Sequence, residues 1–262
     1  MLDLGLHQGT SLYGRMPEDG LRMVTVACAP GGHSLELLWS LCMHWQRLGY
    51  PPVVLDGSAS ESAESPGLID LLEHCLPIEA PRAGHAGEDS LAVLPAAHGL
   101  AVLAEPMPSG VAPLYRLQPL LRRYAVVVLY APVPMLASGL MAEISAPPLL
   151  LLETGPGAVM STYADLKRLA LHANLNGTVL RLAYGQHQRA AAHQQLGTLC
   201  ECAARHLGRT PRTLALDPEH PADLQRLALE LLENAQILPA GAPPALPSSR
   251  DAVRASHHAT SH

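Results

Sequence analysis

The sequence predicts an α/β fold built on a doubly wound, mostly parallel sheet with helices on both faces. Two observations lead to this prediction. Short apolar segments of strand length alternate along the chain with longer amphipathic segments of helical period. One apolar segment, residues 125–130, is a continuous run rich in β-branched side chains, which is typical of a strand buried on both faces. Strands separated by helices form βαβ units, and their right-handed crossovers produce a parallel sheet covered on both sides.

The expected elements follow one another in order along the chain. Each expected strand is an apolar run bounded by Gly, Pro or polar turn residues, and each expected helix repeats its apolar residues every three or four positions. Strands are expected at residues 21–28, 52–55, 99–104, 125–130, 148–152, 177–183 and 213–216. Helices are expected at residues 34–48, 67–76, 112–123, 134–144, 158–173, 186–207 and 221–236.

Length and composition limit the domain organisation and the class of protein. A chain of 262 residues with 48% hydrophobic residues suits one domain with short tails. We expect an N-terminal segment at 1–18, the α/β domain at 19–238 and a disordered tail at 239–262, whose Pro, Ala and Ser residues bury little apolar surface. The formal net charge of -6 gives no basic footprint, so no nucleic-acid partner is expected.

The cysteines and the apolar runs indicate a cytoplasmic location. The five cysteines are an odd number without framework spacing, which argues against a secreted disulfide scaffold. The chain start lacks the basic region of a signal peptide, and no apolar run is long enough to be an integral membrane segment. No metal site is expected, because Cys200 and Cys202 have no second ligand pair at suitable spacing. A metal-binding module built from the scattered histidines and cysteines stays open as an alternative.

The loop after the first strand carries the first motif. In a doubly wound sheet the first strand-to-helix turn is the natural phosphate site. This loop resembles the deviant Walker A loop of the MinD/ParA (SIMIBI) P-loop ATPases, whose pattern is Lys-Gly-Gly-x-Gly-Lys-Thr/Ser. In this chain the loop reads Pro30, Gly31, Gly32, His33, Ser34, Leu35 and Glu36.

Only the two adjacent glycines of that pattern are kept. Pro30 stands at the signature lysine, Ser34 at the second loop glycine, Leu35 at the phosphate-gripping lysine and Glu36 at the magnesium-binding hydroxyl. Leu35 offers no charge to phosphate, and Pro30 removes a backbone donor. Glu36 would repel a triphosphate by roughly 1 kcal/mol or more near a protein surface. The resemblance therefore implies a degenerate P-loop, with neither ATP nor magnesium as a cofactor.

Three further segments resemble the same family. Residues 53–57 resemble its Val-Leu-Leu-Val-Asp-Ala-Asp stretch, which places Asp56 on an aspartate near magnesium and the attacking water. The alternative is that Asp56 caps a turn, and we favour it because the lysines are gone. Residues 124–132 resemble the Walker B run, with Tyr130 in place of the metal-coordinating aspartate. Residues 149–167 resemble the stretch that ends strand six of the family, and this long ordered match carries the most weight.

Two segments resemble the FlhG/FleN branch of flagellar-number regulators. Residues 199–210, followed by a strand and Asp217, are similar to the end of its domain. Residues 7–15 resemble its activator motif Asp-Gln-Ala-x-x-Leu-Arg, through which such proteins stimulate the signal-recognition-type GTPase FlhF. Gln8 and Leu12 match this motif, whereas His7 replaces the aspartate. An exposed Gln can orient an attacking water at a partner's GTP; the alternative is a flexible terminus with a chance Gln.

The resemblance implies a regulatory protein that is not an enzyme. It would be a catalytically inactive member that binds an FlhF-like GTPase and controls flagellar number or placement. One alternative is an ATP-binding or ATP-hydrolysing protein whose rewritten site takes its charge from His33 or Arg22. Another is a pseudo-ATPase scaffold in cellulose secretion, pilus assembly or partitioning.

Without a bridging ATP, we expect a monomer or a dimer held by another surface. Residues 222–236 are amphipathic but acidic, so we expect them to pack on the domain.

Overall fold

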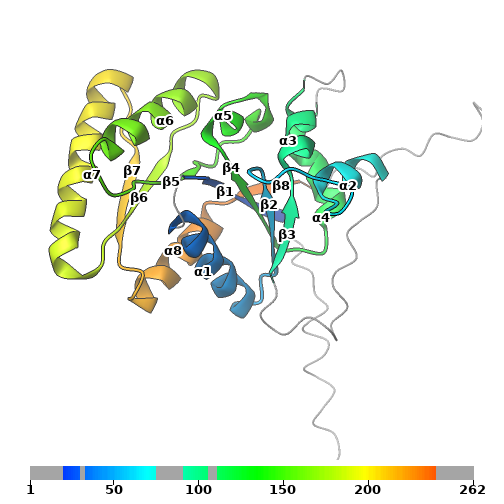
Figure 1. The fold of residues 1–262 in the computed structure, drawn as a ribbon, viewed down its shortest axis with the longest axis horizontal. Helices are drawn as coiled ribbons and strands as arrows, with labels where there is room; N and C mark the ends of the chain where they lie inside the picture. The colour runs from blue at the N-terminus through cyan, green and yellow to red at the C-terminus, as the bar shows by residue number, and fades with distance from the viewer. Residues whose placement is uncertain (1–19, 30–32, 75–90, 106–110, 240–262) are drawn as a thin grey trace, which may run out of the picture.

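Eight strands form one sheet between two layers of helices (Figure 1). The computed structural model describes residues 20–29, 33–74, 91–105 and 111–239. The strands are β1 (Leu21–Ala27), β2 (Pro52–Asp56), β3 (Ala92–Pro95), β4 (Val126–Ala131), β5 (Leu149–Leu151), β6 (Thr178–Leu182), β7 (Arg212–Leu216) and β8 (Gln236–Leu238). Their order is β3-β2-β4-β1-β5-β6-β7, all parallel, with β8 pairing antiparallel with β1. The predicted fold class is confirmed.

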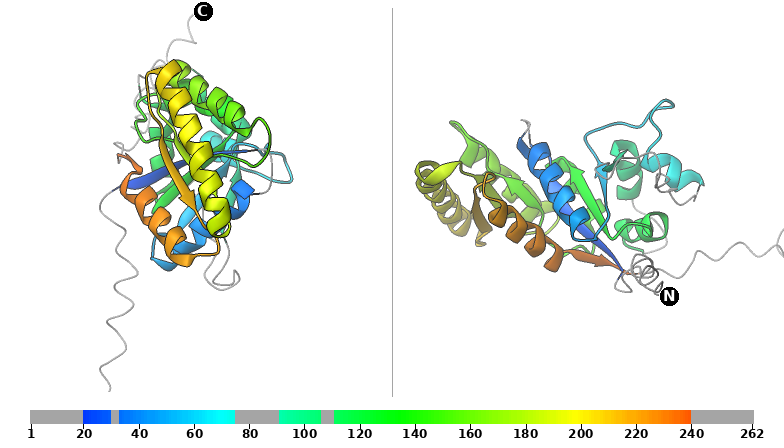
Figure 2. Two further views of the ribbon diagram at one scale, coloured as in Figure 1. Left: turned by 90° about the vertical axis from the view of Figure 1, so that its left-hand side faces the viewer. Right: turned by 90° about the horizontal axis from the view of Figure 1, so that it is seen from below.

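The helices divide into two groups, one on each face of the sheet (Figure 2). They are α1 (His33–Arg47), α2 (Leu68–His74), α3 (Ala97–Ala104), α4 (Gln118–Leu121), α5 (Val133–Leu136), α6 (Ala158–His172), α7 (Gly185–Leu207) and α8 (Pro221–Glu233), with 3-10 turns η1 (Pro113–Leu117) and η2 (Gly139–Met141). Helices α1 and α8 cover one face, and the remaining helices cover the other. No helix within these described ranges is long and apolar enough to cross a membrane.

Helix α8 packs on the domain, as its sequence predicts. It buries Leu224, Leu227 and Leu232 in the core shared with α1. The indole Nε1 of Trp45 in α1 donates a buried hydrogen bond of 2.8 Å to the carbonyl of Ala228 in α8. The apolar face of this amphipathic helix is therefore occupied by its own domain.

Strand β1 is the centre of the sheet and has partners on both edges. On one edge it pairs with β4 along its length, from Arg22 to Ala27. On the other edge β5 pairs with it only at Val26, and β8 pairs with its first three residues. Pro147 and Pro148 precede β5 and have no N–H to donate, which is consistent with the late start of that strand. Strand β8 was not expected from the sequence, because it is only three residues long.

Two predicted elements are wrong. Residues 99–104 form helix α3 and not a strand, and the strand of this region is β3. A short apolar run does not distinguish a strand from a buried helix, and here the tertiary environment selects the helix. The Glu61 carboxylate accepts the backbone N–H groups of His98 and Gly99 at 2.8 and 2.9 Å, which caps the start of α3.

The helix expected at residues 134–144 is the second wrong element. The structure has the short helix α5 and the turn η2 there instead. Ser138 separates the two, because its hydroxyl donates to the Met135 carbonyl at 2.6 Å and accepts the N–H of Leu140 at 3.3 Å. A side chain that bonds to the local backbone in this way competes with continuation of the helix.

The Glu61 cap predicts an acid-sensitive contribution to stability. Burial alone raises the pKa of Glu61, but hydrogen bonds from backbone N–H groups, first among them those of Gly99 and His98, outweigh it and hold the pKa below its ordinary value. A depressed folded-state pKa stabilises the protein above the unfolded-state pKa, and this stability is lost as the pH falls through the folded-state pKa. Glu61→Gln should therefore lower the free energy of unfolding by about 1–2 kcal/mol at neutral pH.

Urea unfolding at several pH values measures this effect. The difference between Glu61→Gln and the parent should shrink as the pH falls through the acidic range. Glu64→Gln is the matched control, since Glu64 is exposed on the same loop. A difference for Glu61→Gln that stays constant with pH would contradict the charged cap.

Close packing of α3 on α2 predicts opposite effects for two Gly-to-Ala changes. A Cβ on Gly99 would lie 2.7 Å from Cγ of Leu68 and 2.9 Å from the backbone N of Ile69. A Cβ on Gly197, which is exposed in α7, would have no neighbour within 4 Å. Gly99→Ala should destabilise the protein by roughly 1–3 kcal/mol, and Gly197→Ala should stabilise it by up to about 1 kcal/mol. Thermal unfolding of both variants checks this, and a neutral Gly99→Ala would refute the close approach.

Candidate functional site

The carboxyl edge of the sheet brings the predicted site residues together. In the register of the parallel strands, Tyr130 of β4 lies opposite Val26 of β1 on one side and Asp56 of β2 on the other. Helix α1 begins at His33, on the same edge. Pro30, Gly31 and Gly32 lie outside the described residues, as do His7, Gln8 and Leu12 of the expected partner-activating segment.

A buried hydrogen bond links Ser34 to Tyr130. The two hydroxyl oxygens are 3.0 Å apart, and either can donate. Ser34 is 1% exposed and Tyr130 is 3% exposed. Burial raises the pKa of the Tyr130 phenol, and the bond to Ser34 lowers it by less. An uncharged phenol therefore stands at the end of β4, tied to the first turn of α1.

The rest of the first turn of α1 is exposed. Leu35 is 52% exposed, and the Glu36 carboxylate points to solvent, with one oxygen 3.6 Å from Nδ1 of His33. A carboxylate in this position suits the positive end of the helix dipole. Trp39, one turn further along, is also about half exposed. Together, Leu35 and Trp39 give α1 an apolar surface beside this edge of the sheet.

Asp56 caps its own turn, which is the arrangement that the sequence favours. Its Oδ1 accepts the backbone N–H of Ser58 at 2.9 Å and the Ser58 hydroxyl at 2.6 Å. The next residue, Gly57, donates its N–H to the Tyr130 carbonyl at 2.7 Å. These bonds form an Asx turn after β2 and hold it against β4.

Few cations are positioned to serve this edge. Arg22 does not, because it lies at the amino end of β1 and its Nη1 donates to the Leu232 carbonyl at 2.9 Å. Arg181 lines a small cavity near His33, but its guanidinium donates to Gln195 at 3.2 Å and to the Leu182 carbonyl at 2.7 Å. That cavity measures about 30 Å³, the share of liquid volume of about one water molecule. Because Arg22 lies at the amino end of β1 and bonds to Leu232, the idea that it supplies charge to a rewritten site is wrong.

An acidic cavity of about 150 Å³ lies on the other side of the same edge. Glu153 and Asp165 are both among its lining residues, together with Cys28. Burial raises the pKa of Asp165, and burial also raises the pKa of the Cys28 thiol. Glu153 and Asp165 were not singled out from the sequence, because neither lies in the loop motif. Within the described part of the chain, no three metal-binding side chains cluster.

Solved structures with a similar fold are ParA/MinD-like P-loop ATPases. Cobyrinic acid a,c-diamide synthase from Mycobacterium smegmatis, with bound ADP and magnesium, is 16% identical; the match covers 85% of this chain and 100% of that one, with a TM-score of 0.51. McdA from Cyanothece, as an ATP complex, is 14% identical; the match covers 84% and 99%, with a TM-score of 0.51. The chain therefore has the ParA/MinD-like P-loop fold. No protein-family model and no curated protein matches the sequence.

The Ser34–Tyr130 bond predicts different outcomes for two Tyr-to-Phe changes. Tyr130→Phe leaves the buried Ser34 hydroxyl without its partner, so it should lower the free energy of unfolding by about 1–2 kcal/mol. The Tyr124 hydroxyl is buried and has no partner among the described residues, so Tyr124→Phe should be neutral or stabilising. Chemical denaturation of both variants measures the difference. An equal change in the free energy of unfolding for both variants would contradict a stabilising bond between α1 and β4.

Proposed function

We propose that this protein is a catalytically inactive member of the ParA/MinD-like P-loop class that acts by binding a protein partner. The observation that carries the proposal is the buried hydrogen bond between Ser34 and Tyr130. The motif resemblance puts the second loop glycine at Ser34 and the metal-coordinating aspartate at Tyr130. Two uncharged hydroxyl groups that satisfy each other thus replace a site for phosphate and metal.

The charges around this edge also argue against magnesium-ATP as a cofactor. Of the two similar structures, the cobyrinic acid a,c-diamide synthase holds ADP and magnesium, and McdA is a complex with ATP. In this chain the only lysine is Lys167, which is exposed on α6. Leu35 and Glu36 take the places of the phosphate-gripping lysine and the magnesium-binding hydroxyl. A polyphosphate requires cations and a metal ligand, so the residues present do not fit it.

The exposed apolar pair on α1 supports binding to a protein. Leu35 and Trp39 are four residues apart, so they lie on the same face of the helix. Tryptophan is one of the residues that are enriched in interface hot spots, so the half-exposed Trp39 is a candidate anchor for a partner. Helix α1, which follows the degenerate loop, thus offers an apolar surface to a partner protein. This surface lies beside the place where the family resemblance puts the nucleotide site.

We further propose that the partner is a signal-recognition-type GTPase of the FlhF kind and that the setting is control of flagellar number or placement. This step rests on the resemblance of residues 7–15 and 199–210 to flagellar-number regulators. The alternatives keep the same fold: an ATP-binding or ATP-hydrolysing protein with a rewritten site, or an inactive scaffold in cellulose secretion, pilus assembly or partitioning. We expect a monomer, or a dimer that forms without ATP, in the cytoplasm.

Titration with magnesium-ATP tests the inactive site. Isothermal titration calorimetry of the full chain should give no saturable heat at micromolar to millimolar nucleotide, because Leu35 and Glu36 provide no counter-charge. A ParA ATPase measured in the same buffer serves as the positive control. Micromolar binding, or ATP turnover abolished by Asp56→Asn, would overturn the proposal in favour of the rewritten active site.

Stimulation of GTP hydrolysis tests the partner. A peptide of residues 1–18 should accelerate GTP hydrolysis by a purified FlhF-type GTPase, because Gln8 would orient the attacking water. Gln8→Ala should remove the acceleration. His7→Ala is the matched control, since its position departs from the motif, and it should retain most of the acceleration. No stimulation by the peptide or by the full chain would exclude this partner while leaving the inactive site untouched.

A further inference from the structure

The acidic cavity at the carboxyl edge lies between the ends of β1 and β5 and helix α6, on the face of the sheet opposite α1. Its volume is about 150 Å³. Part of its wall is apolar and includes the side chains of Val133 and Leu150. Helix α6 contributes residues three or four positions apart, which lie on one face of the helix: Ala158, Ser161, Thr162 and Asp165.

Two carboxylates line this cavity without a cation to pair with them. Glu153 and Asp165 form no ion pair within the described residues. Arg181 lines the small cavity next to Glu153, but its guanidinium already donates hydrogen bonds elsewhere. Arg168 lowers the pKa of Asp165 by less than burial raises it. Removing a carboxylate from water is costly unless a cation or a donor compensates, so the two acids indicate a cationic occupant.

A buried hydroxyl in the same wall has no partner either. Thr162 is 5% exposed and lies one helical turn before Asp165. No hydrogen bond joins its hydroxyl to another described residue, and its oxygen is not among the unpartnered atoms that expose less than 1 Å². Buried hydroxyl groups in proteins nearly always have a partner, so this one indicates a polar group that occupies the cavity.

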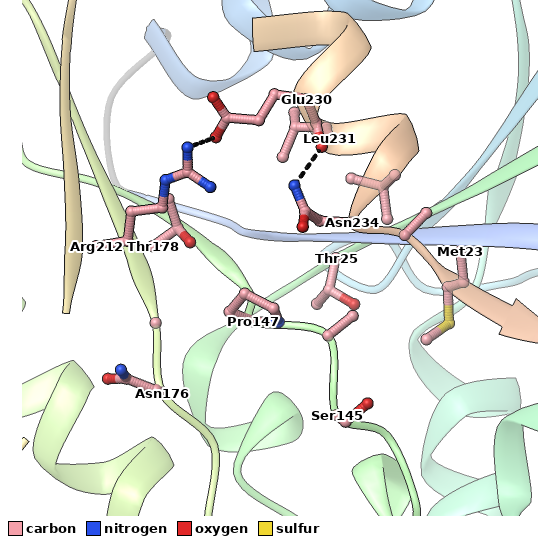
Figure 3. Close-up of a pocket in the computed structure, with 14 residues that line it drawn as sticks. Met23, Thr25, Ser145, Pro147, Asn176, Thr178, Arg212, Glu230, Leu231 and Asn234 are labelled. Atoms are coloured by element: carbon pink, nitrogen blue, oxygen red, sulfur yellow. Dashed lines mark hydrogen bonds and ion pairs between the residues drawn. The ribbon is translucent and has the colours of Figure 1, made fainter.

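The larger cavity at the amino ends of the strands provides a contrast. Its volume is about 220 Å³, and its charged residues Arg212 and Glu230 already form an ion pair of 2.8 Å (Figure 3). The hydroxyl oxygen of Thr25 in its wall exposes less than 1 Å², so a ligand cannot reach it. Only the acidic cavity of these two therefore has polar groups that are both unpaired and within reach of a ligand.

The lining favours an alkylammonium group over a metal ion. Calcium and magnesium usually take about six or more oxygen ligands, and no three metal-binding side chains cluster within the described ranges. An ammonium group has only hydrogen-bond donors, and the carboxylates and the Thr162 hydroxyl can accept from it. The alkyl chain of a lysine lies readily along apolar side chains such as Val133 and Leu150. The volume equals that of about five waters at roughly 30 Å³ each, which suits one such side chain.

We propose that this cavity receives the ammonium group of a lysine side chain from the partner protein. The inference rests on the proposed function, because it names the side chain that would hold the partner at this edge of the sheet. The ammonium group would donate to Glu153, Asp165 and Thr162. The single lysine of this chain, Lys167, lies two residues from Asp165 and thus on a different face of α6, so it does not fill the cavity itself.

An NMR titration of the full chain with n-butylammonium chloride tests the cavity. The protein signals should shift saturably at millimolar concentrations, and 1-butanol, which has the same shape without the charge, should bind at least about tenfold more weakly. The N-acetylated and C-amidated peptide Gly-Lys-Gly should also bind. No saturable binding of n-butylammonium, or equal binding of 1-butanol, overturns the proposal. Binding of n-butylammonium without the peptide would indicate a small metabolite and would overturn the assignment to a protein.

Variants locate the binding. Glu153→Gln and Asp165→Asn each remove one charge and should weaken n-butylammonium binding by roughly three- to tenfold. Thr162→Val keeps the shape of the side chain and should weaken it by roughly threefold. Glu201→Gln is the matched control, because Glu201 is an exposed carboxylate on α7 outside the cavity, and it should leave affinity unchanged. An equal loss in Glu201→Gln, or no loss in the two carboxylate variants of the cavity, overturns the proposal.

Two further measurements separate this inference from the alternatives. Sedimentation equilibrium should show no dimer that Lys167→Ala dissociates, since such a dimer would make a second copy the source of the lysine and overturn the proposal. Titration with magnesium-ATP concerns the inactive site alone. Saturable ATP binding would refute the proposed function, whereas absent n-butylammonium binding would refute the cavity, so the two failures are distinguishable.

Discussion

The structure depends on the backbone hydrogen bonds that β1, the central strand, makes within the sheet. This strand is buried on both faces, so water is not available to satisfy its polar groups. Strand β4 satisfies one edge along its whole length, whereas β5 and β8 share the other edge from opposite directions. The shared edge leaves Val24 and Thr25 between the residues that pair with β8 and the residue that pairs with β5. The parallel register places Tyr130 next to the carboxyl end of β1. The pairing of its two edges thus determines which residues lie near each end of β1.

At the carboxyl end, polar side chains are satisfied by one another. Ser34 bonds to Tyr130, and Ser58 bonds to Asp56. The stability of the fold lies in two apolar cores, one on each face of the sheet. Side chains at the carboxyl edge of the sheet can therefore differ while the fold is kept.

The long, strongly patterned elements were predicted well, and the failures occurred where local pattern was ambiguous. The bounds of helices α1, α6 and α7 and of strand β4 are close to the expected ranges. The three helices repeat their apolar residues over many positions, and β4 is rich in β-branched side chains. The strand expected at residues 99–104 was wrong, because a short run of apolar residues suits either a strand or a buried helix. The choice is made by Glu61, which lies far upstream in the sequence and caps the first N–H groups of α3. At the site, the sequence identified Ser34, Asp56 and Tyr130, but not the hydrogen bonds that join Ser34 to Tyr130 and Ser58 to Asp56.

The sequence by itself determined the class of fold and the absence of lysine from residues 28–36, because both follow from residue type and spacing along the chain. Apolar period selects strand or helix, and a leucine or a proline has no cation wherever it is placed. The tertiary structure alone decided that Tyr130 bonds to Ser34 and that Arg22, at the amino end of β1, bonds to the Leu232 carbonyl. Each of these depends on distances between residues that are far apart in the chain. Such distances are set by the packing of the whole sheet and its two helical layers.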